Sequence, residues 1–300
     1  MTSSPLDVLV VGGSGVDTVV RVPALPVPSA DAHQVGPIRE QPGQTGGNVA
    51  LGCRALGLDV ALLDHIGDDW PGRLVRERLA AGGVALEALV SPAGTRRAVN
   101  LVDPSGRRMS FYDGRDPADL RIPRSFHLPR LRRARHIHLS IVNFARFLLD
   151  DIEELGIPVS TDLHDWDGVA DHHREFALRC DVVFLSAAGA GDRVAEVMRD
   201  ILREGRARIV VATAGEAGSL LLTRDGGGPL PVPAVVPPAP VVDSNGAGDA
   251  YVSAFLLGLL TGHGPERCAR LGSVAGAHAC TGEGNTALIG RAELLAAAPY

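Results

Sequence analysis

A helix start able to hold an anion is encoded in the stretch Asp243-Ser244-Asn245-Gly246-Ala247-Gly248-Asp249, which runs directly into apolar residues at helical spacing. Small residues before a helix expose its first backbone N–H groups. Together with the positive end of the helix dipole, these groups form a site for phosphate oxygens. A carboxylate at Asp249 could accept a proton from a hydroxyl beside that phosphate, or could simply compensate the helix dipole. The stretch by itself leaves both interpretations open.

A second glycine-rich stretch, Gly43-Gln44-Thr45-Gly46-Gly47-Asn48, precedes another predicted helix, which ends at Leu56 before Gly57. Its glycines permit close approach of the backbone to a polar ligand, and Asn48 can hydrogen-bond hydroxyl groups. Asn48 is also the predicted N-cap of the helix. The alternative interpretation of this stretch is a flexible loop.

Around these two stretches the hydrophobic pattern alternates between strands and helices, which favours an α/β fold with a doubly wound, mostly parallel sheet flanked by helices. Further β-rich segments at residues 16–22, 98–102 and 109–112 predict a small second sheet. Six prolines between Pro229 and Pro240 predict edge strands or an extended connection, with a linker between domains as the alternative. The main strands are predicted at residues 8–11, 60–63, 137–139, 158–161, 182–185, 209–212 and 219–223, and the helices at 48–56, 73–81, 147–155, 193–204, 247–260 and 265–280.

The composition limits the chemistry that the chain can perform. Its 300 residues are 45% hydrophobic, enough for a large globular core. The net charge of -6 argues against a nucleic-acid partner, because such binding relies on basic side chains that neutralise phosphates. The sequence contains no lysine, which excludes Schiff-base chemistry and a phosphate-loop lysine.

The cysteines and the apolar segments indicate where the protein works. Cys53, Cys180, Cys268 and Cys280 lack C-x-x-C spacing, so we expect reduced, mostly buried thiols. No apolar stretch approaches the ~20 residues needed to span a bilayer. We therefore expect a cytoplasmic protein without a membrane partner.

The two glycine-rich stretches, about 200 residues apart, resemble the paired signature motifs of the ribokinase (PfkB-type) family of carbohydrate and nucleoside kinases. The resemblance extends along the chain through Gly67-Asp68-Asp69 with Gly72, and through Thr213-Ala214-Gly215-Glu216-Ala217-Gly218, which is similar to the family's nucleotide loop. It implies one ribokinase-like catalytic domain over residues 1–300. A small β-sheet lid, formed by about residues 16–42 and 95–116, would be inserted in that domain.

The resemblance also implies an ATP-dependent phosphotransferase that uses Mg²⁺ and acts on a hydroxyl of a small sugar or nucleoside. Asp249 would be the general base, and the backbone amides of Gly246, Ala247, Gly248 and Asp249 the anion hole. A monovalent cation such as K⁺ is implied beside that hole. The other implied residues are Asp17, Gly43, Gly47 and Asn48 for the substrate, Thr213, Gly215 and Gly218 for ATP, and Asp243, Asn245, Ala279 and Gly284 for the cation.

Residues that follow predicted strands are further candidates for the site, because ligands in open α/β sheets bind beyond the carboxyl ends of the strands. Asn143 is predicted to contact substrate hydroxyls, with a helix cap as the alternative. Asp162, His164, Asp165 and Trp166 are candidates for the same reason. A metal site built from these residues with Asp171, His172 and His173 is disfavoured, because the spacing matches no closed ligand set.

The missing N-x-x-E motif and the identity of the acceptor leave the function open. Where the family has an N-x-x-E motif near its magnesium site, this chain has Ser186-Ala187-Ala188-Gly189. This departure implies either slower catalysis or a shift of water-mediated magnesium contacts to other groups such as Asp192. The alternative function is therefore a weakened kinase fold that binds a ligand or regulates. A nucleoside acceptor would need an aromatic platform, for which Phe111, Tyr112 and Trp166 are available, and the lid offers a surface for a homodimer.

Overall fold

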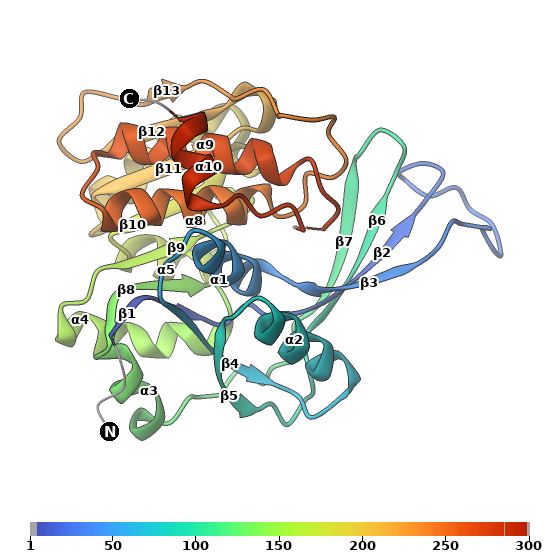
Figure 1. The fold of residues 1–300 in the computed structure, drawn as a ribbon, viewed down its shortest axis with the longest axis horizontal. Coiled ribbons are helices and arrows are strands. Elements are labelled where there is room, and N and C mark those ends of the chain that lie inside the picture. The colour runs from blue at the N-terminus through green and yellow to red at the C-terminus, as the bar shows by residue number, and fades with distance from the viewer. Residues whose placement is uncertain (1–4, 285, 299–300) are drawn as a thin grey trace.

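The computed structural model describes residues 5–284 and 286–298, and within them the chain forms a large and a small sheet (Figure 1). The large sheet has the order β13-β12-β11-β10-β9-β8-β1-β4-β5 and is parallel except at β12, which pairs antiparallel with both β11 and β13 near one edge. The edge strand β13 contains Pro231, as the proline-rich segment predicted. The strands are β1 (Leu6–Val11), β4 (Val60–Ile66), β5 (Ala85–Val90), β8 (Ala134–Ser140), β9 (Val159–Asp162), β10 (Val182–Ser186), β11 (Ile209–Thr213), β12 (Ser219–Thr223) and β13 (Leu230–Val232).

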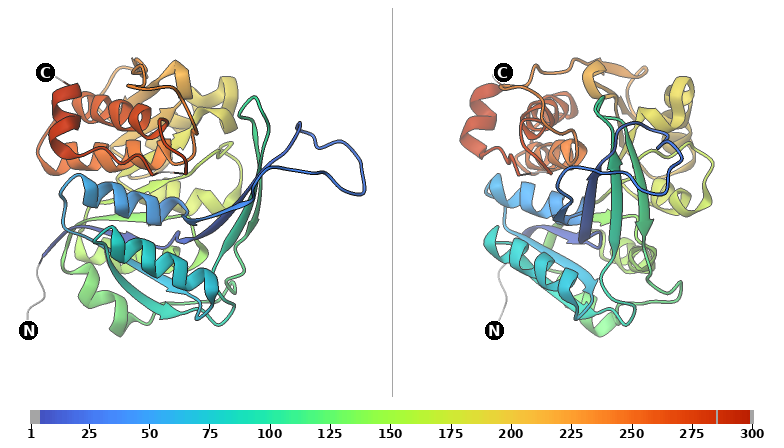
Figure 2. Two further views of the ribbon diagram at one scale, coloured as in Figure 1. Left: turned by 45° about the vertical axis from the view of Figure 1, so that its right-hand side comes forward. Right: turned by 90° about the vertical axis from the view of Figure 1, so that its right-hand side faces the viewer.

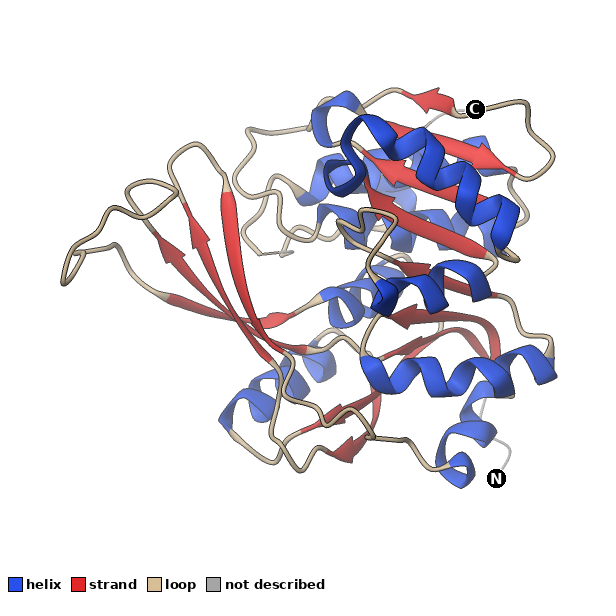
Figure 3. Ribbon diagram, turned by 180° about the vertical axis from the view of Figure 1, so that it is seen from behind, coloured by secondary structure: helices blue, strands red, loops and turns tan. Residues whose placement is uncertain are grey.

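Helices cover both faces of the large sheet, which places two hydrophobic cores on either side of it (Figure 3). In β1, Val8 packs into one core and Leu9 into the other, as expected for a central parallel strand. One face carries α1 (Thr45–Ala55), α2 (Trp70–Ala81), α8 (Ala247–Leu260), α9 (Pro265–Ala279) and α10 (Arg291–Ala297). The other carries α3 (Arg124–Leu131), the 3-10 helix η1 (Asn143–Leu148), α4 (Leu149–Leu155), α5 (Asp171–Arg179) and α7 (Val194–Glu204). The short turns are α6 (Ala187–Ala190), η2 (Gly191–Arg193) and η3 (Gly215–Ala217).

The small sheet projects from the body of the molecule, and the loop over residues 22–38 extends beyond it (Figure 2). Its order is β3-β2-β6-β7, with β2 parallel to β6 and the other two pairs antiparallel. The sequence did not predict β3, whose residues include Pro42 and no β-branched side chain. The strands are β2 (Gly15–Arg21), β3 (Arg39–Gly43), β6 (Arg97–Val102) and β7 (Arg108–Asp113).

The prediction that Asn48 caps its helix is wrong. Helix α1 begins at Thr45 with Gln44 as the N-cap, so Gly46 and Gly47 lie in its first turn and not in a loop. The close packing of this turn against the end of β1 explains the glycine, because a Cβ at Gly46 would lie 1.9 Å from the carbonyl oxygen of Gly12. The segment is therefore a rigid helix start.

The cysteines are free thiols, and Cys280 alone among them is partly exposed. Among the described residues, no helix is both long enough and apolar enough to cross a bilayer.

Candidate active site

The starts of helices α1 and α8 meet, which brings together the two glycine-rich stretches. The Asn48 side-chain Nδ2 donates a hydrogen bond to Asp249 Oδ2 at 2.8 Å. Behind this contact, the Ser253 hydroxyl donates to the Val49 carbonyl at 3.1 Å. Gly52 allows the close approach, because a Cβ there would lie 2.4 Å from the Ser253 hydroxyl oxygen. Asp249 and the predicted substrate residue Asn48 therefore share one site.

Asp249 is half-buried and surrounded by other acidic groups. Burial raises its pKa from 3.8 to about 7, while the Asn48 hydrogen bond opposes the rise. The nearby carboxylates of Asp162 and Asp17 raise the pKa further, and His164 lowers it. A carboxylate whose pKa lies near neutrality is suited to exchange protons with a hydroxyl group.

Asp17 reaches this site from the small sheet. It lies on β2, is 9% exposed, and its pKa is raised to about 6 by burial, against the opposing effects of Gln44 and Arg108. Gly43, at the end of β3, contacts the same group of residues, since a Cβ there would lie 2.9 Å from Asn48 Oδ1. A Cβ at Gly47 would make only an ordinary contact, 3.7 Å from the Ser14 Cβ.

The loop after β9 adds two side chains to the site. The backbone N–H of His164 donates to Asp162 Oδ1 at 2.9 Å, and its φ of 54° is a conformation that few non-glycine residues adopt. Its ring Nε2 lies 3.4 Å from the Thr45 hydroxyl at the start of α1. Trp166, by contrast, is 4% exposed and donates to the Ala170 carbonyl, so its prediction as a site residue is wrong.

The register of the small sheet decides which aromatic side chains can reach the site. Asp17 pairs with Ala98, and Ala98 pairs with Tyr112, so these three side chains share one face of the small sheet. Phe111 points to the opposite face. Of the three aromatic candidates, only Tyr112 lies on the same side as Asp17.

The residues predicted to bind the nucleotide and part of the predicted anion hole line one cavity of about 930 Å³. Gly246 is the N-cap of α8, with φ 81°, and no side chain caps the helix. The Ala247 N–H donates to the Ser244 carbonyl at 3.3 Å, so the amides of Gly248 and Asp249 are the first that no side chain keeps from a ligand. Gly218 has φ 92°, and a Cβ there would lie 2.2 Å from the Val232 carbonyl oxygen. The cavity is lined by Thr213, Gly215, Glu216, Gly218, Ala234, Val235, Val236, Pro237, Val241, Ser244, Ala247, Gly248, Tyr251, Ser273, Gly276, Ala277 and Cys280.

The residues predicted to hold a monovalent cation gather beside the start of α8. Asp243 accepts hydrogen bonds from the backbone N–H of Asn245 at 2.9 Å and of Gly284 at 3.1 Å. The Ala279 carbonyl accepts from the Gly282 N–H at 3.3 Å. Arg108 of the small sheet donates to Asn245 Oδ1 at 2.7 Å, so the small sheet contacts this cluster.

Asn143 and the position of the missing N-x-x-E motif contact other parts of the chain. The Asn143 side chain donates to the Ala118 carbonyl at 2.5 Å, and no contact between described residues joins it to Asp17 or Asp249. At the motif position, a Cβ on Gly189 would lie 1.7 Å from the Asp165 carbonyl oxygen. The loop after β9 therefore fills the space that a glutamate side chain would need. The described residues contain no group of three or more His, Cys, Asp or Glu side chains placed to hold a metal ion.

Comparison with known proteins gives matches over nearly the whole chain. Residues 173–289 match a family model described as pfkB family carbohydrate kinase. Acarbose 7(IV)-phosphotransferase of Actinoplanes sp. is 47% identical over 280 residues, which is 93% of either chain. The solved structure of the microbiome-derived acarbose kinase Mak1 is 45% identical, with a TM-score of 0.89 over 97% of this chain and 98% of that one. Ribokinase of Arabidopsis thaliana, solved with ribose and ATP, is 21% identical with a TM-score of 0.81 over 99% and 100% of the two chains, and shows that the fold is ribokinase-like.

Proposed function

Because the chain belongs to the pfkB family of carbohydrate kinases, we propose that it transfers the γ-phosphoryl group of ATP to one hydroxyl of a carbohydrate, with Asp249 as general base. The observation that carries this proposal is the hydrogen bond between Asn48 and Asp249, which joins the acceptor side of the site to the start of α8. The nucleotide cavity reaches the same helix start at Ala247 and Gly248.

In this mechanism the acceptor hydroxyl lies between Asp17 and Asp249. Asp249 takes the hydroxyl proton as the oxygen attacks the γ-phosphorus, and the bond to the β-phosphate oxygen breaks to release ADP. The amides of Gly246, Ala247, Gly248 and Asp249 stabilise the charge on the transferring group. Asn48, Gly43 and Gly47 hold the acceptor. We also keep the proposal that Asn143 contacts hydroxyl groups at the edge of the acceptor.

The nucleotide would lie in the cavity along Thr213, Gly215 and Gly218. Mg²⁺ bound with ATP would neutralise charge on the β- and γ-phosphates. Since Gly189 cannot carry a side chain, we propose that Asp165 and Asp192, two exposed carboxylates after β9 and β10, face the water around that metal. Asp243, with the carbonyls of Asn245, Ala279 and Gly284, is the proposed site for a monovalent cation such as K⁺.

For the acceptor we propose an oligosaccharide of the acarbose type. Identity of 47% over 93% of the chain to a protein that phosphorylates acarbose supports this choice over ribose. The chain also has only Tyr112 as an aromatic side chain on Asp17's face of the small sheet, and Tyr112 is 58% exposed, which is a poor platform for a nucleoside base. Asp162 and His164 are the side chains that would adapt the site to this acceptor.

We further propose that the small sheet is a lid over the acceptor and that its outer face pairs two copies of the chain. Closure would exclude water, which competes as a phosphoryl acceptor. The opposite face from Asp17 carries Val99, Met109 and Phe111, which are 38%, 41% and 56% exposed. An apolar patch of this kind favours a homodimer through the small sheet.

Release of ADP from ATP with acarbose, maltotetraose, ribose and adenosine tests the proposal. We expect turnover with acarbose, and no turnover in the Asp249→Asn variant although acarbose still binds. A chain that acarbose stabilises against heat but that releases no ADP with any acceptor would instead be a ligand-binding or regulatory module. Turnover only with adenosine would contradict the carbohydrate acceptor.

A further inference from the structure

The chain passes four times between the main body and the small sheet, and three of these crossings converge on one side chain, Arg96. Ser14 precedes β2, Arg96 precedes β6, and Asp116 follows β7. Arg96 is 1% exposed and is the largest fully buried side chain among the described residues. A buried guanidinium at the base of a projecting sheet is the feature that remains unexplained by the reaction itself.

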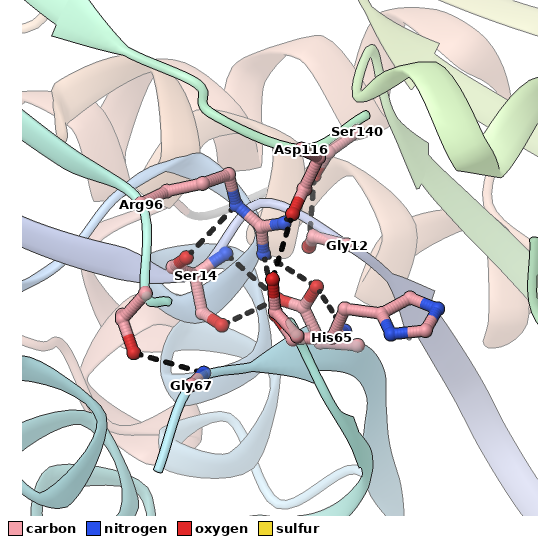
Figure 4. Close-up of polar contacts among 10 residues, drawn as sticks. Gly12, Ser14, His65, Gly67, Arg96, Asp116 and Ser140 are labelled. Carbon is pink, nitrogen blue, oxygen red and sulfur yellow. Dashed lines mark hydrogen bonds and ion pairs between the residues drawn. The ribbon is translucent and has the colours of Figure 1, made fainter. Parts of the chain in front are cut away.

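Arg96, at the entry to β6, donates to partners at two other crossings and on β4 (Figure 4). Its Nε donates to the Ser14 carbonyl at 3.2 Å, and its Nη1 donates to Asp116 at 2.5 Å. Its Nη2 donates to Asp64 at 2.5 Å and to the His65 carbonyl at 3.3 Å, both at the end of β4 in the large sheet. The guanidinium therefore links the entry to β2, the entry to β6 and the exit from β7 to one strand of the main body.

Asp64 completes the network and is fully buried. It accepts hydrogen bonds from the Ser14 backbone N–H at 3.0 Å, from the Ser14 hydroxyl, and from the His65 N–H at 2.7 Å. Burial opposes the charge on Arg96, but Asp64 and Asp116 outweigh it and hold the pKa of Arg96 above its ordinary value. The arrangement is a satisfied buried ion triad, and removing one member leaves an uncompensated charge.

The fourth crossing, from β3 into α1, is tied to the first. The backbone N–H groups of Gly46 and Gly47 donate to the Gly13 carbonyl at 2.8 and 3.1 Å. Gly15, at the start of β2, packs closely against the residue before β6, because a Cβ there would lie 2.6 Å from the Arg96 carbonyl oxygen. The base of the small sheet and the start of α1 are thus one packed unit.

We infer that Arg96 is a positioning residue for the carbohydrate acceptor: by tying three crossings to Asp64, it sets where Asp17 stands relative to Asp249. Asp17 follows Ser14 by three residues on β2 and pairs with Ala98, two residues after Arg96 on β6. Neither Arg96 nor its partners lines the nucleotide cavity. A change at Arg96 should therefore move the acceptor side of the site and leave the ATP side in place. The inference rests on the proposed acceptor site.

The test compares Asp116→Asn, which keeps the shape of the network, and Arg96→Met with the control Arg97→Met. Arg97 is the next residue on β6, and among the described residues its side chain makes one ion pair, an exposed one with Glu40. The readouts are KM and kcat for acarbose and for ATP, together with calorimetric Kd values for acarbose and for ADP. Misplacing a group by about 1 Å can lower the reaction rate ~100-fold. We therefore expect the KM and Kd for acarbose to rise by at least about tenfold in Asp116→Asn.

The KM for ATP and the Kd for ADP should stay within about twofold of the wild-type values. The control Arg97→Met should leave the KM and Kd values of both ligands unchanged. If Arg96→Met does not fold, Asp116→Asn decides the question. A lowered melting temperature with both ligands bound as in the wild type would show a merely structural role and overturn the inference. Wild-type protein that binds acarbose but releases no ADP would refute the proposed reaction alone, because the split between the two Kd values would still test Arg96.

Discussion

Replacing Asn48 with alanine should shift the pH dependence of the reaction toward higher pH. In the wild-type protein the pKa of Asp249 is raised to about 7 by burial, and the Asn48 amide opposes the rise by donating to the ionised carboxylate at 2.8 Å. Only the ionised form can accept the acceptor's proton. With a pKa near 7, about a tenth of the molecules are active at pH 6 and about nine tenths at pH 8, so kcat/KM should rise roughly tenfold between them.

The size of the shift follows from the hydrogen bond that is lost. A hydrogen bond to a charged group contributes about 1.5–3 kcal/mol, and each pKa unit corresponds to about 1.4 kcal/mol. Loss of the Asn48 amide should therefore raise the midpoint of the kcat/KM profile by about one to two units. Asn48→Ala should also weaken acceptor binding, but that loss lowers the whole profile without moving its midpoint.

The assay is the initial rate of ADP release with acarbose between pH 5.5 and 9.5 for the wild type, Asn48→Ala and Asn100→Ala. Asn100 is a matched control, because it is equally buried and its side chain accepts a hydrogen bond from the Ser110 hydroxyl of the small sheet. A wild-type midpoint near pH 4, or an Asn48→Ala midpoint at or below that of the wild type, would refute the assignment of Asp249 as the base.

Three further predictions follow from the same contacts. The folded-state pKa of Asp249, about 7, lies above its ordinary 3.8, so the fold loses stability as the pH rises from about 4 to about 7. Asp249→Asn should therefore melt at a higher temperature than the wild type at pH 8, and this difference in melting temperature should shrink as the pH falls from 7 toward 4. Gly218→Ala should raise the KM for ATP by about tenfold or more and leave the KM for acarbose unchanged, because its Cβ would collide with the Val232 carbonyl beside the nucleotide cavity. Met109→Ser combined with Phe111→Ser should turn a dimer into a monomer in light scattering without lowering the melting temperature, and an unchanged mass would exclude the outer face of the small sheet as the interface.

The sequence predicted the main elements because their signals are local. Helix α8 begins and ends where the apolar period and the glycine-rich start placed it, over residues 247–260. Most strands of the large sheet followed from short β-branched runs between turn residues, but β5, whose only β-branched residue is Val90, was not predicted. Where the signal was weak or ambiguous the prediction failed: β3 has no strand pattern, and the glycines before Asn48 were taken for a loop although the chain had already entered α1.

The roles of individual side chains depended on contacts that no local pattern contains. Trp166 follows a strand like Asp162 and His164, yet it turns into the core while they face Asp249. Arg96 carries no motif and drew no attention in the sequence, because its importance comes from partners at positions 14, 64 and 116. The signal that could have found it is an arginine at the start of a strand predicted to be buried, with acidic residues after neighbouring strands.

By itself the sequence indicated the family, most of the strands and helices, and two glycine-rich helix starts, because periodicity, glycine spacing and helix-end chemistry act over a few residues. Only the tertiary structure decided that those two starts meet, that Asp249 is buried enough for its pKa to approach 7, and that a buried Arg96 joins the small sheet to the main body. The physical reason is that burial and electrostatic environment are set by side chains that folding brings together from distant positions, and a carboxylate or a guanidinium takes its chemistry from those neighbours.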